Sequence, residues 1–275
     1  MLTLPGVEPP PRRSGILRAA SFVRPYLLGA AGSAYIFALG WTRARHRAQI
    51  VELCRHFGYH DHLRGQAELP VIDLASLVPE GTLLDVRAID SVAGNVSERE
   101  LIALCGLVRS GSPQLLFEFG TFDGRTTLNL AVNSPAESAV HTLDLPRSSI
   151  NESAAPLHSE EIRYADKPVS GARFRGTSAS GKIAQLYGDS GTFDFSEYEG
   201  RVDFVFIDAS HTYEYVINDS LNAIRMLRSG RGTIVWHDYS KWEGVTRALN
   251  DLRTNAGEFS GLRWIAGTTL AILTR

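Results

Sequence analysis

The chain has 275 residues, of which 44% are hydrophobic, so it can bury one core of the size found in α/β domains. A formal net charge of −2 provides no overall positive field that would recruit nucleic acid. Neither of its two cysteines, Cys54 and Cys105, has a second metal ligand nearby at zinc spacing, which favours ordinary apolar residues in a reduced, cytoplasmic compartment. A small or locally recognised substrate therefore fits the composition better than a nucleic acid.

Residues 1–96 are expected to form an N-terminal extension. Prolines crowd the first dozen residues and predict an irregular lead, and helical material is expected to follow to about Phe57. From Leu69 to Asn95, prolines and glycines interrupt the short apolar runs, which predicts irregular connecting structure.

Within this extension, residues 26–41 are uncharged and largely apolar, with arginines on both sides. The run is shorter than the ~20 residues of a spanning helix, contains three glycines and has no small-residue cleavage site after it. We therefore favour a buried or partner-facing helix, with peripheral association with a membrane surface as the alternative.

Strands and helices alternate from Ser97 onward. Ser97 and Glu100 have the spacing of a capping box, which predicts the start of a helix. Strands are expected at residues 115–119, 140–145, 183–187, 202–207 and 233–236, and helices at 125–132, 213–227 and 244–253. This alternation predicts a parallel sheet covered on both faces.

The C-terminus departs from the alternation. Two apolar runs, 262–265 and 268–273, are separated only by Ala266 and Gly267, which is too short for a parallel crossover. The last strand must therefore run antiparallel to its neighbour. The fold class predicted for residues 97–275 is a doubly wound α/β domain with a mostly parallel, seven-stranded, Rossmann-like sheet and a C-terminal antiparallel hairpin.

The segment Glu118-Phe-Gly-Thr-Phe-Asp-Gly124 follows the first of these strands, where open parallel sheets bind nucleotides. Its two glycines allow a tight turn and close backbone approach to a ligand. A dinucleotide fingerprint would have a third glycine where this chain has Thr127. Glu118 would repel a pyrophosphate but suits an ammonium group, while Thr126 and Thr127 can donate to a carboxylate at the helix start.

Acids also follow the second and third strands of the domain. Asp144 is placed to accept both hydroxyls of a ribose, and Asp189, within Gly188-Asp-Ser190, is placed to accept from an adenine amino group. A single aspartate at such a position often only caps a helix or turn. The order of the strand ends nevertheless favours an adenosine site.

Together with Phe206-Ile-Asp-Ala-Ser-His211, these segments resemble the cofactor site of class I S-adenosylmethionine-dependent methyltransferases. The nearest subgroup contains catechol O-methyltransferase and macrocin O-methyltransferase, and the resemblance runs from about Ser97 to the C-terminus. It implies S-adenosylmethionine as the cofactor. The binding residues that it implies are Glu118, Gly120, Thr121, Phe122, Gly124, Thr126, Asp144, Gly188, Asp189, Ser190 and Asp208.

The same resemblance implies the residues of the reaction. Asp208 matches an acid that binds a metal, and His211, three residues later, matches the general base. His237 and Asp238 match the other metal ligands, although a histidine departs from the acidic or amide residue expected there, so a requirement for Mg²⁺ or another divalent cation stays open. The structural alternatives are that Asp208 caps a helix, His211 packs against adenine and His237 is an ordinary buried histidine.

The expected function is O-methylation of a hydroxylated small molecule or glycan. The long polar connection at 145–182 is expected to act as a lid over the acceptor. Candidates for an acceptor pocket are Tyr213, Tyr215, Tyr239 and Trp242. An NAD-type oxidoreductase on the same sheet and a non-catalytic cofactor-binding module remain as alternatives, and a homo-oligomer is compatible with each.

Overall fold

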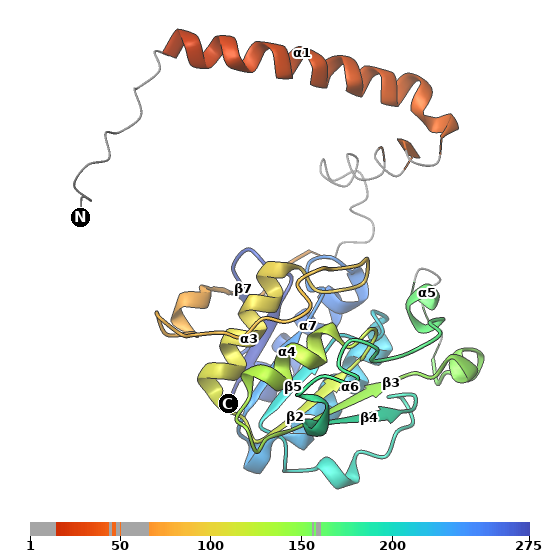
Figure 1. The fold of residues 1–275 in the computed structure, drawn as a ribbon. Coiled ribbons are helices and arrows are strands. Elements are labelled where there is room, and N and C mark those ends of the chain that lie inside the picture. The colour runs from red at the N-terminus through yellow and green to blue at the C-terminus, as the bar shows by residue number, and fades with distance from the viewer. Residues whose placement is uncertain (1–14, 44–45, 48–49, 51–65, 156, 158–160) are drawn as a thin grey trace, which may run out of the picture. The chain divides into compact units, whose positions relative to one another are not determined.

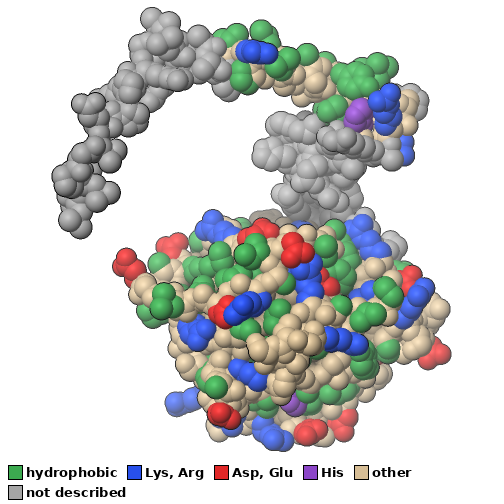
Figure 2. Space-filling model, in the orientation of Figure 1, with side chains coloured by type: hydrophobic (Ala, Val, Ile, Leu, Met, Phe, Trp, Pro, Cys, Tyr) green, Lys and Arg blue, Asp and Glu red, His purple; other side chains and the backbone are tan. Residues whose placement is uncertain are grey.

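The computed structural model describes residues 15–43, 46–47, 50, 66–155, 157 and 161–275, and the chain divides into two compact units, 1–61 and 62–275. In the first unit, helix α1 (Gly15–Leu39) is followed by the short 3-10 turn η1 (Gly40–Thr42) (Figure 1). Hydrophobic side chains are exposed along α1 (Figure 2). The predicted helical extension is therefore confirmed as far as residue 42; the proline-rich lead and residues 51–57 lie outside the described residues. No helix in the described part of the chain is long and apolar enough to cross a membrane.

The second unit is built on one eight-stranded sheet with the order β1-β7-β8-β6-β5-β2-β3-β4. Only β8 runs antiparallel, to both β6 and β7, which confirms the predicted terminal hairpin. The strands are β1 (Val71–Ile72), β2 (Leu115–Phe119), β3 (Ala139–Asp144), β4 (Ile183–Tyr187), β5 (Phe204–Ile207), β6 (Thr233–Trp236), β7 (Arg263–Ile265) and β8 (Ala271–Thr274).

One strand was not predicted. β1 lies in the stretch expected to be irregular and pairs in parallel with β7, with Val71 opposite Trp264 and Ile72 opposite Ile265. Two residues are too few for a period-two pattern to show in the sequence. The compact unit accordingly begins at His62, so the connector packs with the domain that the sequence predicts to start at residue 97.

The helices and turns of this unit cover both faces of the sheet. Ser97 and Glu100 form the predicted capping box at the start of α3, with both reciprocal hydrogen bonds present. The helices are α3 (Glu98–Gly111), α4 (Arg125–Asn133), α5 (Ile162–Ala165), α6 (Tyr213–Met226) and α7 (Glu243–Asn255), and the 3-10 turns are η3 (Leu74–Ser76), η4 (Arg147–Glu152), η5 (Ser180–Lys182), η6 (Ser196–Tyr198), η7 (Arg228–Gly230) and η8 (Gly257–Phe259).

Neighbouring side chains on each strand enter different cores. Phe117 and Val205 belong to the core cluster that contains residues of α6 and α7, whereas Leu116 and Phe206 belong to the cluster that contains residues of α3 and α4. Because side chains alternate across a strand, the central strands β2 and β5 each serve both cores. This confirms the predicted coverage of the sheet. Cys105 is buried in the α3 cluster, and its burial raises the pKa of the thiol to about 12.

Buried polar side chains of α4 hold the connector against the domain. The guanidinium of Arg125, 1% exposed, donates to the carbonyl oxygens of Ala88, Ile89 and Val96 at 2.8–3.1 Å. Asn133 accepts from the backbone N–H of Asp85 at 3.0 Å and donates to its carbonyl at 2.7 Å. These bonds satisfy the buried guanidinium of Arg125 and the buried amide of Asn133, which would otherwise lack partners.

Candidate active site

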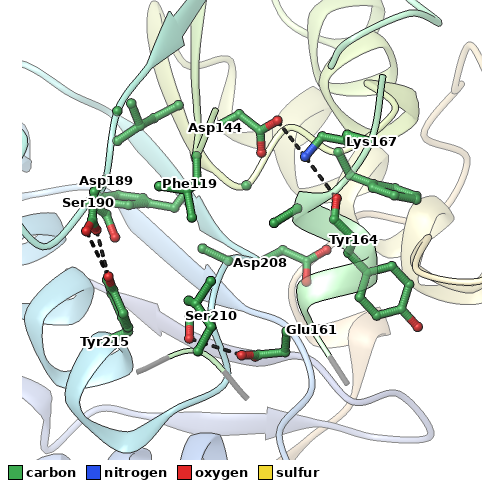
Figure 3. Close-up of a pocket in the computed structure, with 18 residues that line it drawn as sticks. Phe119, Asp144, Glu161, Tyr164, Lys167, Asp189, Ser190, Asp208, Ser210 and Tyr215 are labelled. Carbon is green, nitrogen blue, oxygen red and sulfur yellow. Dashed lines mark hydrogen bonds and ion pairs between the residues drawn. The ribbon is translucent and has the colours of Figure 1, made fainter. Parts of the chain in front are cut away.

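An open pocket of about 700 Å³, counted with its mouth, lies where β2, β3, β4 and β5 end (Figure 3). This is the edge at which the predicted binding residues meet. Those that line the pocket are Gly120, Phe122, Asp144, Gly188, Asp189, Ser190 and Asp208. The lining residues that the sequence did not identify as cofactor ligands are Phe119, Leu143, Leu145, Leu157, Glu161, Tyr164, Ala165, Lys167, Ala209, Ser210 and Tyr215.

Gly120 is the point at which the loop after β2 meets the end of β5. Its φ is +89°, and a Cβ there would lie 2.0 Å from the carbonyl oxygen of Asp208. Its backbone N–H donates to Leu143 at 2.8 Å, which ties the loop to the end of β3 as well. Glycine is therefore required, because both the backbone conformation and the close approach exclude a side chain. Gly124, with φ +85°, occupies the N-cap position of α4.

Glu118 lies beneath the loop and does not line the pocket. One of its carboxylate oxygens accepts from Thr142 at 2.6 Å and from Thr127, while the other, Oε1, has no partner. Burial raises the pKa of Glu118 to about 8, against the lowering effect of the two threonine bonds. Thr121 is also buried and is hydrogen-bonded to Thr142 at 2.7 Å, so the structure places Thr121, like Glu118, within the packing of the loop.

The two predicted adenosine acids both have partners within the chain. Asp144 is 2.7 Å from the ammonium of Lys167, and its Oδ2 atom has no hydrogen bond besides this ion pair. Asp189 accepts from the hydroxyl of Tyr215 at 2.8 and 2.9 Å and from the backbone N–H of Ala154 at 2.6 Å. Burial, and then the bond to Asp189, raise the pKa of Tyr215 to about 12, so Tyr215 remains a hydrogen-bond donor.

His211 is held between two carboxylates. Its Nε2 atom is 2.6 Å from Asp238, and its Nδ1 atom and backbone N–H both contact Glu161. The ring stacks on Trp242 with centroids 4.5 Å apart. Burial lowers the pKa of His211, but the hydrogen bonds and charges of Asp238 and Glu161 outweigh it and raise the pKa to about 9. His211 is therefore an imidazolium in this arrangement, since each carboxylate accepts a hydrogen bond from a protonated ring nitrogen.

The other three aromatic candidates differ in position. Tyr215 lines the pocket, whereas Tyr213 donates to Asp251 at 3.0 Å, and Tyr239 is fully buried, where it accepts from the backbone of Leu69 at 2.9 Å.

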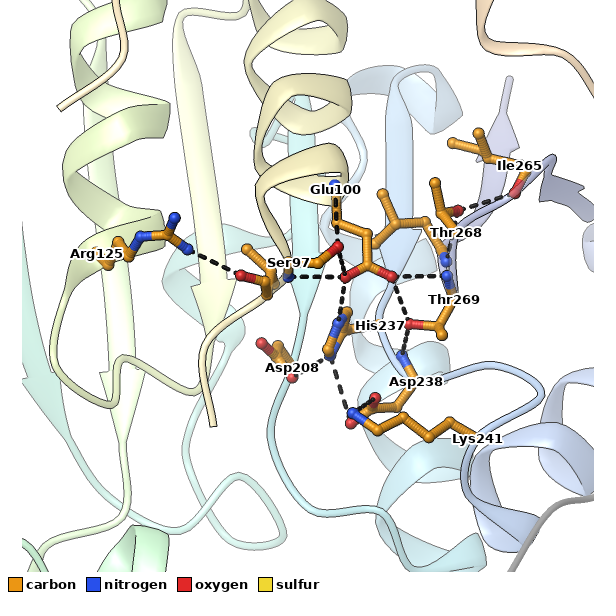
Figure 4. Close-up of polar contacts among 12 residues, drawn as sticks. Ser97, Glu100, Arg125, Asp208, His237, Asp238, Lys241, Ile265, Thr268 and Thr269 are labelled. Carbon is orange, nitrogen blue, oxygen red and sulfur yellow. Dashed lines mark hydrogen bonds and ion pairs between the residues drawn. The ribbon is translucent and has the colours of Figure 1, made fainter. Parts of the chain in front are cut away.

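His237 lies behind the pocket in a second buried network (Figure 4). Its Nδ1 atom is 3.1 Å from Asp208, and its Nε2 atom is 3.3 Å from Glu100, which also accepts from the backbone N–H of Thr269 at 2.7 Å. Burial lowers the pKa of His237, but Asp208 and Asp238 outweigh it and hold the pKa well above its usual value. His237 is thus a buried cation among carboxylates, and Glu100, known from the sequence only as a helix cap, is one of its partners.

A group of three side chains offers ligand atoms to a metal ion. Single ligand atoms of Asp208, His211 and Asp238 all lie within 4.8 Å of one another in the described part of the chain. This group contains two of the three predicted ligands, with His211 where His237 was expected. Carboxylate and imidazole donors suit a divalent cation. However, the ammonium of Lys241 is 3.0 Å from Asp238, so a cation already contacts one of the three.

Comparison with known proteins gives one family match. A family profile described as a methyltransferase domain matches residues 117–239. No curated protein matches the chain. The O-methyltransferase TomG from Streptomyces achromogenes, involved in tomaymycin synthesis, is similar to 73% of this chain over 93% of its own length, with 16% identity and a TM-score of 0.47. An O-methyltransferase from Bacillus cereus is similar over 67% of this chain and 84% of its own, with 15% identity and a TM-score of 0.46.

Proposed function

We propose that this chain is an S-adenosylmethionine-dependent methyltransferase that methylates a hydroxyl group of a small molecule or glycan, with His211 as the general base. One observation carries the choice of base. Asp238 orients His211 through Nε2, while Nδ1 points to Glu161, which lines the pocket beside Ser210. An acid on one nitrogen and a pocket-side group on the other is the arrangement of an oriented general base.

The proposed reaction needs positioning and one proton transfer. Asp144 would accept hydrogen bonds from the ribose hydroxyls and Asp189 from the adenine amino group, and S-adenosylmethionine held by them would supply the activated methyl group. The acceptor oxygen then forms a bond to the methyl carbon as the carbon–sulfur bond breaks and its electron pair returns to sulfur. The hydroxyl proton goes to Nδ1 of His211. For this, Glu161 must leave Nδ1 and take the Nδ1 proton with it, since an imidazolium cannot accept a proton.

A divalent cation is a second hypothesis for the same site. Asp208, His211 and Asp238 would hold it, and a bound cation would lower the proton affinity of the acceptor hydroxyl. The nitrogen of His211 that binds a metal cannot also take the proton. The convergence of the three ligand atoms supports the hypothesis, and the contact between Lys241 and Asp238 weighs against it.

The sequence leaves two alternatives to this function, an NAD-type oxidoreductase and a non-catalytic cofactor-binding module. The methyltransferase family match replaces the oxidoreductase reading. A non-catalytic cofactor-binding module predicts binding of S-adenosylmethionine without transfer to any acceptor, and an activity measurement separates it from the proposal.

The test of the proposed function is transfer from isotopically labelled S-adenosylmethionine to a panel of acceptors, read by mass spectrometry. The panel pairs each phenol, alcohol or glycoside with its amine analogue. We expect label only on oxygen, and His211→Gln to bind S-adenosylhomocysteine while losing transfer. Label on the amines alone would contradict O-methylation, and undiminished transfer by His211→Gln would remove the base assignment.

A further inference from the structure

We propose that the segment from Glu161 to Lys167 is an internal occupant of this active site. In the ligand-free protein, Lys167 would occupy the position of the ribose hydroxyls and Glu161 the position of the acceptor hydroxyl (Figure 3). The inference rests on the proposed function, because that function assigns Asp144 and His211 to these two ligands.

Lys167 occupies one oxygen, Oδ2, of the acid that the cofactor would use. Its ammonium lies 2.7 Å from Asp144 and donates to the carbonyl of Tyr164 at 3.0 Å. The side chains of Lys167 and Asp144 are only 13% and 8% exposed, so the pair lies inside the pocket and is poorly screened by water. Because Oδ2 of Asp144 has no hydrogen bond beyond this ion pair, a ribose hydroxyl must compete with the ammonium for it.

Glu161 closes the reacting side of His211. Its carboxylate contacts Nδ1 and the backbone N–H of His211, and it accepts from Ser210 at 3.4 Å. The Glu161 side chain is 8% exposed. While it is in place, the acceptor hydroxyl has no access to Nδ1. Asp238 holds the opposite nitrogen from the turn after β6 and is independent of this segment.

The two contacts belong to one short piece of structure. Between Glu161 and Lys167 lies the single-turn helix α5, and the backbone N–H of Tyr164 donates to the carbonyl of Glu161 at 2.8 Å. The Tyr164 ring packs edge-on against Phe122 of the cofactor loop, with centroids 5.8 Å apart. Displacement of Lys167 by the ribose therefore moves the element that carries Glu161, and cofactor binding exposes the base.

This mechanism predicts that the occupant lowers apparent cofactor affinity. The measurement is calorimetric titration of S-adenosylhomocysteine, which cannot react, into the full chain and three single variants. Lys167→Met should bind about tenfold more tightly, as expected if roughly nine molecules in ten are in the occupied form. Glu161→Gln should also bind more tightly, although Glu161 does not touch Asp144. Glu152→Gln, which removes an exposed charge from η4 in the same connection, is the matched control and should bind as the unaltered chain does.

Each outcome bears on the inference separately from the proposed function. Unchanged or weaker binding by Lys167→Met would overturn the occupant, because the lysine would then support the cofactor. Tighter binding by Lys167→Met with unchanged binding by Glu161→Gln would overturn the coupling between the two contacts. Thermal melting of each variant checks that it folds. Lys167→Gln replaces Lys167→Met if the latter does not fold. A gain in affinity cannot arise from misfolding. Absence of binding by all proteins would instead refute the proposed function itself.

Discussion

Replacing Gly120 with alanine should destabilise the domain far more than the addition of one methyl group suggests. A left-handed φ of +89° costs a non-glycine residue about 1–2 kcal/mol. The new Cβ would lie 2.0 Å from the carbonyl oxygen of Asp208 and 2.7 Å from its carbonyl carbon. Both groups are backbone, so relief requires the β2 and β5 ends to separate, which adds about 1–3 kcal/mol. We expect the free energy of unfolding to fall by about 2–5 kcal/mol, a large part of the total for a typical domain.

Urea unfolding of the two alanine variants Gly120→Ala and Gly176→Ala tests this reasoning. Gly176 has a φ of +72° and no atom within 4 Å of the site of a Cβ, so it reports the conformational cost alone. Gly176→Ala should therefore lose only about 1–2 kcal/mol. Equal losses in the two variants would refute the claim that the loop packs against the Asp208 peptide.

Three further predictions concern the charged groups of the site. His211→Gln should lower kcat by about 10²–10⁴ while the variant still binds S-adenosylhomocysteine, and an unchanged rate would contradict the role as base. The pKa of Glu118 is about 8 in the folded protein, against an ordinary value of 4.5. Its contribution to stability is therefore complete below pH 4.5 and is lost as the pH rises through 8. Between these two pH values, the melting temperature of Glu118→Gln should depend less on pH than that of the unaltered chain. Lys241→Met should strengthen any binding of Mg²⁺ measured by calorimetry, because it removes the ammonium from Asp238; no binding by either protein would eliminate the metal hypothesis.

The sheet was predictable because its signals are local. Apolar runs, the capping box at Ser97 and the short spacing around Gly267 each depend on neighbouring residues, and the structure contains the corresponding strands, helix and hairpin. In a parallel sheet the carboxyl ends of the strands meet at one edge. The proximity of Asp144, Asp189 and Asp208 could therefore be predicted from their positions at successive strand ends.

The partners of these acids could not be predicted, because they come from distant segments without a motif. Lys167 and Glu161 lie in a polar connection whose sequence indicates only a long crossover. Glu100 is 137 residues from His237 in the sequence, and the sequence indicated only its role in the helix capping box. The sequence therefore located the site and left the charge pairing within it to tertiary structure.

Asp144 is the residue proposed to bind the ribose of S-adenosylmethionine, and the proposed cofactor site depends most directly on it. Calorimetric titration of S-adenosylmethionine into the unaltered chain and into Asp144→Ala, each with and without Mg²⁺, measures that contribution. We expect one cofactor per chain and, because hydrogen bonds to a charged group contribute about 1.5–3 kcal/mol, at least about tenfold weaker binding by Asp144→Ala. No binding by the unaltered chain in either condition, or equal affinity in the two proteins, would contradict the account.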